Sequence, residues 1–77
     1  IMKISIEYCS VWNYLPRASS LEQHLKAKYD GAAIELISSG GGVFEVTLEN
    51  ELIFSKKSLG RFPDDGEIDT LIDQNIA

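Results

Sequence analysis

Cys9 carries the most reactive side chain in this 77-residue sequence, which contains no other cysteine. It follows a segment of alternating polarity, and a helix is predicted to begin a few residues after it. The dipole and the free N–H groups at a helix N-terminus favour the thiolate, which is the form that attacks disulfides and peroxides. The competing interpretation is a buried cysteine that acts as a small hydrophobic side chain. Cys9 is therefore our candidate catalytic residue, with a structural role as the alternative.

Trp12 stands three residues after Cys9, where a dithiol redox protein carries its second cysteine. That second thiol releases a mixed disulfide within one molecule. Because the chain has one cysteine, an intramolecular dithiol mechanism is excluded, and any oxidoreductase activity is limited to a single thiol. The indole also suits a docking surface for a protein partner, which we place over Trp12 and Phe44. Ser10 and Val11 lie between the thiol and the indole and complete this part of the candidate site.

Three glycines at residues 40–42 form a second notable feature. A glycine run can cradle a phosphate when a helix N-terminus follows it. A strand is predicted to follow here, so the pattern favours either close approach of Gly41 and Gly42 to the Cys9 turn, or mobility. We include both glycines in the candidate site.

The remaining titratable residues give weaker indications. His24 has no second histidine and no cysteine at metal-ligand spacing, so we expect it at the surface and predict no metal site. Lys56, Lys57 and Arg61 form either a solvated connection or a site for an acidic ligand, such as the carboxylates of glutathione or an acidic protein. We expect no bound cofactor, with glutathione as a candidate co-substrate.

The composition limits the classes of partner. With 44% hydrophobic residues, 25% charged residues and a net charge of -5, the chain is typical of one globular domain over residues 1–77. The negative charge argues against nucleic acid and against an anionic membrane surface. The apolar runs are too short to cross a bilayer, and we find no signal-peptide pattern. We therefore expect a cytoplasmic protein with a reduced thiol, and the oligomeric state stays open.

Two hydrophobic periods follow one another at the start of the chain. Residues 2–8 alternate between apolar and polar, which predicts a strand with one buried face. A spacing of three and four residues then predicts a helix that begins within residues 13–15, with Pro16 in its first turn. Asp30 and Gly31 end this helix. Its apolar face consists of Leu15, Ala18, Leu21, Leu25 and Tyr29.

The second half of the chain predicts strands at residues 32–37, 43–48 and 52–54. Residues 49–51 join the last two strands as an antiparallel hairpin, and residues 56–63 form a connection. Asp64 and Asp65 offer capping groups for a final helix that runs to the end of the chain. The order is β-α-β-β-β-α, and its first three elements favour a right-handed unit with parallel strands.

Several segments together resemble the selenoprotein W-related (Rdx, or SelT/SelW/SelH) family of small thioredoxin-like proteins. They are Tyr8-Cys9 before a helix, Gly42-Val43-Phe44-Glu45-Val46, Leu52-Ile53-Phe54-Ser55-Lys56-Lys57, and Gly60-Arg61-Phe62-Pro63. The resemblance extends from Ile4 to about Ile76. It implies an α/β thioredoxin-like fold, an α+β two-layer sandwich with a four-stranded mixed sheet.

The same resemblance implies a redox role in cell redox homeostasis, linked to glutathione or thioredoxin, through a Cys-x-x-Cys or Cys-x-x-selenocysteine motif. Cys9 matches the first motif position. Trp12 departs from the second, which carries selenocysteine in the selenium-containing members.

Two functional hypotheses result. The first is a redox-related protein whose Cys9 forms mixed disulfides with glutathione or a protein, which an external thiol then resolves. The second is a non-catalytic binding module that uses the Trp12 and Phe44 surface. Exposure separates them, because an open thiol favours redox chemistry whereas a thiol buried under the indole favours a binding or structural role.

Overall fold

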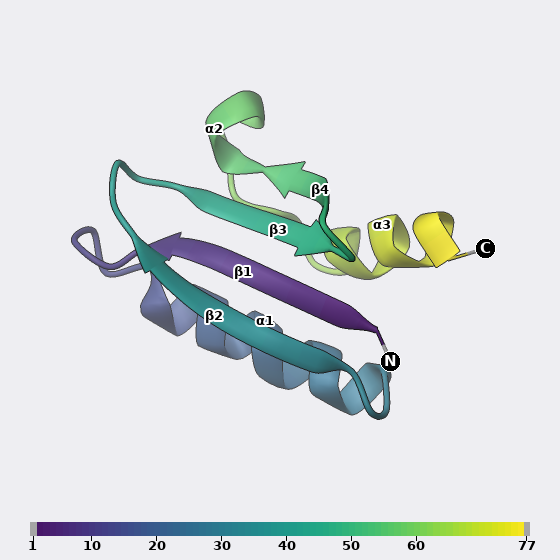
Figure 1. The fold of residues 1–77 in the computed structure, drawn as a ribbon. Coiled ribbons are helices and arrows are strands. Elements are labelled where there is room, and N and C mark those ends of the chain that lie inside the picture. Colours follow the sequence, from purple (N-terminus) through teal and green to yellow (C-terminus); the bar gives the residue numbers. More distant parts are fainter. Residues whose placement is uncertain (1, 77) are drawn as a thin grey trace.

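The computed structural model describes residues 2–76 and contains one four-stranded sheet with helices. The elements are β1 (Lys3–Cys9), α1 (Leu15–Lys28), β2 (Ala33–Ser39), β3 (Phe44–Leu48), β4 (Glu51–Ser55), α2 (Lys56–Leu59) and α3 (Glu67–Ile76). The strands lie in the order β2-β1-β3-β4 (Figure 1). β1 is parallel to β2 and antiparallel to β3, and β4 is antiparallel to β3. The expected mixed sheet is confirmed.

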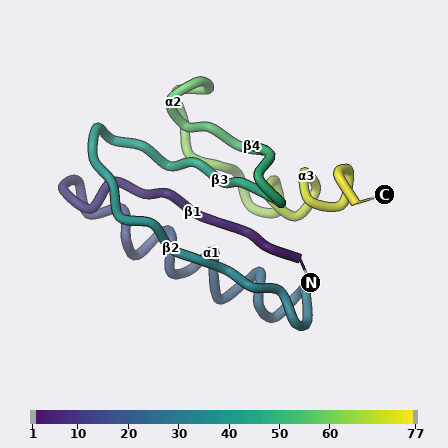
Figure 2. Tube along the Cα trace, viewed as in Figure 1, coloured from purple at the N-terminus to yellow at the C-terminus, as the bar shows by residue number. Residues whose placement is uncertain are grey.

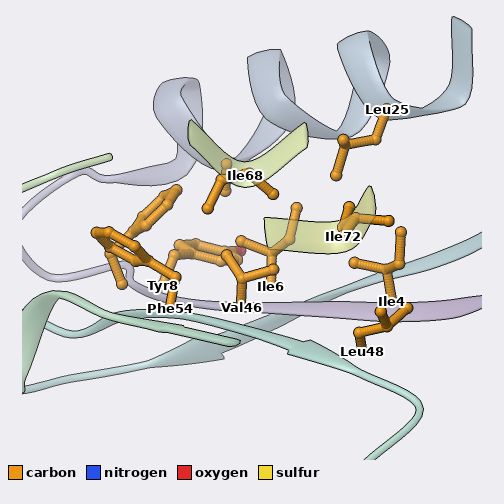
Figure 3. Close-up of a cluster of buried hydrophobic side chains, with 11 residues drawn as sticks. Ile4, Ile6, Tyr8, Leu25, Val46, Leu48, Phe54, Ile68 and Ile72 are labelled. Carbon is orange, nitrogen blue, oxygen red and sulfur yellow. The ribbon is translucent and has the colours of Figure 1, made fainter. Parts of the chain in front are cut away.

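The core lies between one face of the sheet and the helices α1 and α3. β1 alternates as the sequence predicts, so that Ile4, Ile6 and Tyr8 are buried. Figure 3 shows Leu25 of α1 and Ile68 and Ile72 of α3 directed toward this face of the sheet. One cluster joins all of these side chains with Ala18, Phe44, Val46, Leu48 and Phe54. The molecule is therefore a two-layer sandwich.

Polar bonds tie the C-terminal half of α1 to α3. Nε2 of His24 donates to Oδ2 of Asp69 at 2.7 Å, and Nζ of Lys28 lies 3.3 Å from the same oxygen. Burial alone would raise the pKa of Asp69, but the bonds from His24 and Lys28 hold it below its ordinary value. The Tyr29 hydroxyl donates to Oδ1 of Asp73 at 2.6 Å, and burial together with this carboxylate raises the pKa of Tyr29. His24 is thus at the surface, as the sequence predicts, with a structural partner.

A short helix, α2, occupies part of the segment in which the sequence predicts only a connection. The Ser55 side chain accepts a hydrogen bond from the Ser58 N–H at 3.1 Å and caps the helix N-terminus. Gly60 ends it with a φ of 75°. Serine and glycine at these two positions are the local signals for the helix, and a four-residue helix has too short a hydrophobic pattern to be recognised otherwise.

The hairpin between β3 and β4 turns within two residues. Glu49 and Asn50 have φ values of 50° and 72°, as a tight turn between twisted strands requires. Glu51, which the sequence assigns to the turn, begins β4 instead. The register shifts between Val46 and Thr47, where Phe54 and Leu52 are their respective partners, so Ile53 is the extra residue of a bulge.

The end of the sheet that carries Cys9 brings three segments together. β1 and β2 are parallel and end side by side, with Cys9 opposite Ser39, and β3 begins at Phe44 opposite Tyr8. The loop after β1 and the loop between β2 and β3 therefore lie next to each other, away from the two termini (Figure 2). This end of the sheet holds the candidate site.

Candidate functional site

Cys9 is the last residue of β1, and its side chain is fully buried, with 0% exposure. Its backbone N–H donates to the Val43 carbonyl at 3.0 Å, which extends the sheet toward the glycine loop. The backbone N–H of Trp12 donates to the Cys9 Sγ at 3.4 Å. The thiol is therefore closed to solvent, which by the exposure criterion alone favours a binding or structural role. It has one backbone donor directed at its sulfur, the Trp12 N–H.

Residues 10–14, here called the thiol loop, separate Cys9 from α1. The Asn13 N–H donates to the Ser10 carbonyl at 3.1 Å, and the Tyr14 N–H donates to the Cys9 carbonyl at 3.0 Å. Asn13 adopts a φ of 60°, an uncommon value that asparagine tolerates. Because α1 begins only at Leu15, the donor at the sulfur belongs to the thiol loop and not to the first turn of the helix.

The indole of Trp12 rests on Gly42 of the glycine loop (residues 40–42). A Cβ built on Gly42 would lie 2.8 Å from Cε3 and 3.0 Å from Cη2 of Trp12, so that only glycine leaves room for the ring. An added Cβ at Gly40 or Gly41 meets nothing within 4 Å. The close approach that the sequence predicts occurs at Gly42, whereas Gly41 faces open space.

The proposed docking surface needs a correction at Phe44. Trp12 is 60% exposed and Val11 is 80% exposed, but Phe44 is only 1% exposed. Phe44 points toward the core because it continues the buried set of β3 with Val46 and Leu48. The exposed apolar surface beside the thiol therefore consists of Val11 and Trp12 without Phe44.

A row of aromatic rings extends from the thiol loop into the core. The Trp12 and Tyr14 ring centroids lie 6.1 Å apart, Tyr14 and Phe62 4.8 Å apart, and Phe62 and Phe44 5.4 Å apart, all edge to face. The sequence predicts no place in the site for Tyr14 or Phe62. Phe62 lies 50 residues from Trp12 in the chain, and no local spacing indicates their common row.

Cations lie over this aromatic row. The Arg17 guanidinium carbon is 4.0 Å from the Phe62 ring centroid, and Nζ of Lys56 is 5.2 Å from the same centroid and 5.5 Å from that of Tyr14. Arg61 does not join them. Its two terminal nitrogens lie 2.7 and 2.9 Å from the Glu67 carboxylate oxygens, and this hydrogen-bonded pair lowers the pKa of Glu67 to about 2. Of the basic cluster that the sequence suggests, Lys56 thus lies over the aromatic rings, whereas Arg61 forms an ion pair.

A hollow of about 620 Å³ lies between the first half of α1 and residues 62–69. Arg17, Phe62, Asp64 and Asp65 line it together with the His24–Asp69 pair. No group of three potential metal-binding side chains occurs within residues 2–76. In the same range, no helix has the length and apolar character needed to cross a membrane.

Comparisons with known proteins agree over almost the whole chain. The model of the Rdx family matches residues 3–74. The chain is 34% identical over 62 residues to Migration and invasion enhancer 1 of Bos taurus, covering 80% of this chain and 54% of that protein. It is 32% identical over 73 residues to Selenoprotein W of Gallus gallus, covering 90% and 79%. The chain thus spans about half the length of the bovine relative.

The fold of a solved structure agrees as well. The crystal structure of a selenoprotein W-related protein from Vibrio cholerae superposes with a TM-score of 0.91 at 26% identity, covering 99% of this chain and 98% of the other. The expected thioredoxin-like sandwich is consistent with this neighbour. Because the family model matches residues 3–74, and a relative and a solved structure each cover at least 90% of the chain, this chain belongs to the Rdx family of selenoprotein W-related, thioredoxin-like proteins, which are generally associated with redox chemistry.

Proposed function

We propose that this protein performs single-thiol redox chemistry at Cys9. The observation that carries the proposal is the position of the thiol at the C-terminal end of β1, with the Trp12 N–H directed at the sulfur at 3.4 Å. This donor would meet the negative charge of a thiolate. Membership of a redox-associated family supports the same conclusion.

The reaction is a pair of thiol–disulfide exchanges. The Cys9 thiolate attacks one sulfur of a disulfide, such as oxidised glutathione, and the S–S bond of that disulfide breaks. A new S–S bond joins Cys9 to one half, and the other half leaves as a thiolate and takes up a proton from water. A thiol from outside the protein then attacks the mixed disulfide and releases Cys9, because the chain has no second cysteine to do so.

The burial of Cys9 adds a requirement to this mechanism. A thiol with 0% exposure cannot meet a disulfide, so the thiol loop must open first. Few contacts hold the loop closed. Both Ser10 polar groups, the N–H at 3.0 Å and the hydroxyl at 3.2 Å, donate to the Ser39 carbonyl, and the Trp12 indole rests on Gly42. Segments with so few buried contacts open at a low free energy.

The test is the intact mass of the native protein after treatment with oxidised glutathione. We expect one glutathionyl group on the wild type, its release by dithiothreitol, and no addition to the Cys9→Ser variant. Trp12→Ala should accelerate the addition, since the indole no longer anchors the thiol loop. A native protein that stays unmodified, both as wild type and as Trp12→Ala, would overturn the proposal.

A second candidate is a non-catalytic module that binds a protein through Val11 and Trp12. The observation that favours it is a closed thiol beside two exposed apolar side chains. Cys9→Ser should then preserve capture of a partner, and Trp12→Ala should weaken it. Loss of capture in the serine variant would count against this candidate.

A further inference from the structure

Two cations share one aromatic ring beside the thiol loop. Arg17 lies 4.0 Å and Lys56 5.2 Å from the Phe62 ring centroid. Within residues 2–76, neither has a carboxylate oxygen within 4.0 Å, unlike Lys26, Lys28 and Arg61. Two like charges at one ring repel each other, and an anion placed near both would relieve that repulsion.

The surrounding charges do not neutralise this pair. Glu67 is bound by Arg61, and Glu45 accepts hydrogen bonds from the Ser55 hydroxyl at 2.7 Å and the Lys57 N–H at 3.3 Å. Asp64 and Asp65 line the same hollow as Arg17 and oppose the attraction of an anion. Asp64 lies 3.9 Å from Arg61, but that cation is already paired with Glu67, so both Asp64 and Asp65 are opposing charges.

Contacts through Tyr14 link Lys56 to the thiol loop. Lys56 is 5.5 Å from the Tyr14 ring, and the Tyr14 N–H donates to the Cys9 carbonyl at 3.0 Å. The Trp12 ring, which anchors the thiol loop, is 6.1 Å from the Tyr14 ring. An anionic group bound at Arg17 and Lys56 would therefore belong to a molecule that approaches the thiol loop.

We infer that the exchange at Cys9 selects anionic disulfides, and that Arg17 and Lys56 are the residues that select them. The inference rests on the proposed function and adds its substrate class. In the first exchange, a carboxylate of the disulfide is attracted to the two cations while the Cys9 thiolate attacks a sulfur, and the S–S bond breaks to release the other half as a thiolate. The net charge of -5 would repel such a substrate elsewhere on the surface.

The experiment compares three disulfides of different charge. They are oxidised glutathione, which is anionic, 2-hydroxyethyl disulfide, which is neutral, and cystamine, which is cationic. The rate of each with a variant is divided by its rate with the wild type, which removes the intrinsic difference between the reagents. A change in loop opening shifts all three ratios together, whereas a change in local charge shifts the anionic and cationic ratios in opposite directions.

Removal of either cation should give the charge pattern. We expect Arg17→Gln and Lys56→Gln each to slow the reaction with oxidised glutathione by about threefold, which is the effect of removing one unit charge about 6 Å from a substrate carboxylate in water. The same variants should accelerate the reaction with cystamine and leave the reaction with the neutral disulfide unchanged. Asp65→Asn should act in the opposite direction. Lys26→Gln is the control, because it changes the net charge by the same amount at a lysine that pairs with Glu22 away from the site. It should leave all three rate ratios near one. At about 1 M salt the selectivity should vanish.

The outcomes separate this inference from the proposed function. Failure of Cys9 to react with any of the three disulfides would overturn the proposed function and the inference together. Reaction with all three, with equal ratios in Arg17→Gln and Lys56→Gln, would overturn the charge selection alone. Opposite shifts for the anionic and cationic reagents, absent in Lys26→Gln, would support it.

Discussion

Replacement of Gly42 by alanine tests the contact that anchors the thiol loop. The added Cβ would lie 2.8 Å from Cε3 of Trp12, closer than carbon atoms approach, so the indole must leave its place. Gly41→Ala is the matched control, because Gly41 has a φ of 69° against 71° for Gly42 but open space around an added Cβ. Both alanines carry the same left-handed strain of about 1–2 kcal/mol. The difference between the two variants therefore isolates the indole contact.

The exposure of Trp12 limits the free energy of that contact. At 60% exposure, about 100 Å² of the residue is covered, given roughly 250 Å² for a whole tryptophan. At about 25 cal/mol per Å², the contact contributes at most about 2.5 kcal/mol. If loop opening costs this upper limit of about 2.5 kcal/mol, roughly one molecule in 70 is open. We therefore expect Gly42→Ala to raise the alkylation rate of Cys9 by up to about 70-fold over Gly41→Ala.

The assay is alkylation of the native protein with iodoacetamide, followed by intact mass. Trp12 is the only tryptophan, so its fluorescence reports independently whether the indole has moved. Circular dichroism of both variants establishes that the rates belong to folded protein. Equal alkylation rates in Gly42→Ala and Gly41→Ala would refute the anchoring role of the indole.

Three further substitutions test other contacts. The ion pair with Arg61 lowers the pKa of Glu67 from 4.5 to about 2, so the stabilisation from this pair is present at neutral pH and is lost as the pH falls from about 4.5 to about 2. In urea unfolding, Glu67→Gln should therefore lose less stability than the wild type over this pH range. Asp69→Asn, which weakens the bond from His24, should lower the free energy of unfolding by about 1 kcal/mol at pH 7, and an unchanged urea midpoint would contradict this. Phe44→Leu should cost about 1–2 kcal/mol in thermal unfolding, whereas a surface role would predict less than about 0.5 kcal/mol.

Much of the fold could be predicted from the sequence because its periods are clear. The alternation before Cys9 identified β1, and the face that includes Ala18 and Leu25 identified α1. Leu15, which fits the same spacing, is 45% exposed, whereas Ala18 one turn later is buried. Helical spacing predicts a common face, but it does not show how far the sheet beneath that face extends.

The candidate site was only partly predictable. The proximity of Cys9, Trp12 and Gly42 followed from the strand order and from the glycine run. The meeting of Arg17 and Lys56 at Phe62 did not, because it depends on how α1, α2 and the segment before α3 pack. The expected docking role of Phe44 fails because the alternation of β3 turns this side chain toward the core.

The central claim is that Cys9 reacts from the folded protein through opening of the thiol loop. The most direct test is the rate of Cys9 modification by oxidised glutathione across low urea concentrations, where the protein stays native. Local opening exposes little surface, so we predict a rate that hardly changes until the unfolding transition begins. The contradicting result is a rate whose logarithm rises from the lowest urea concentrations with the full slope of global unfolding. The thiol would then react only in the unfolded chain.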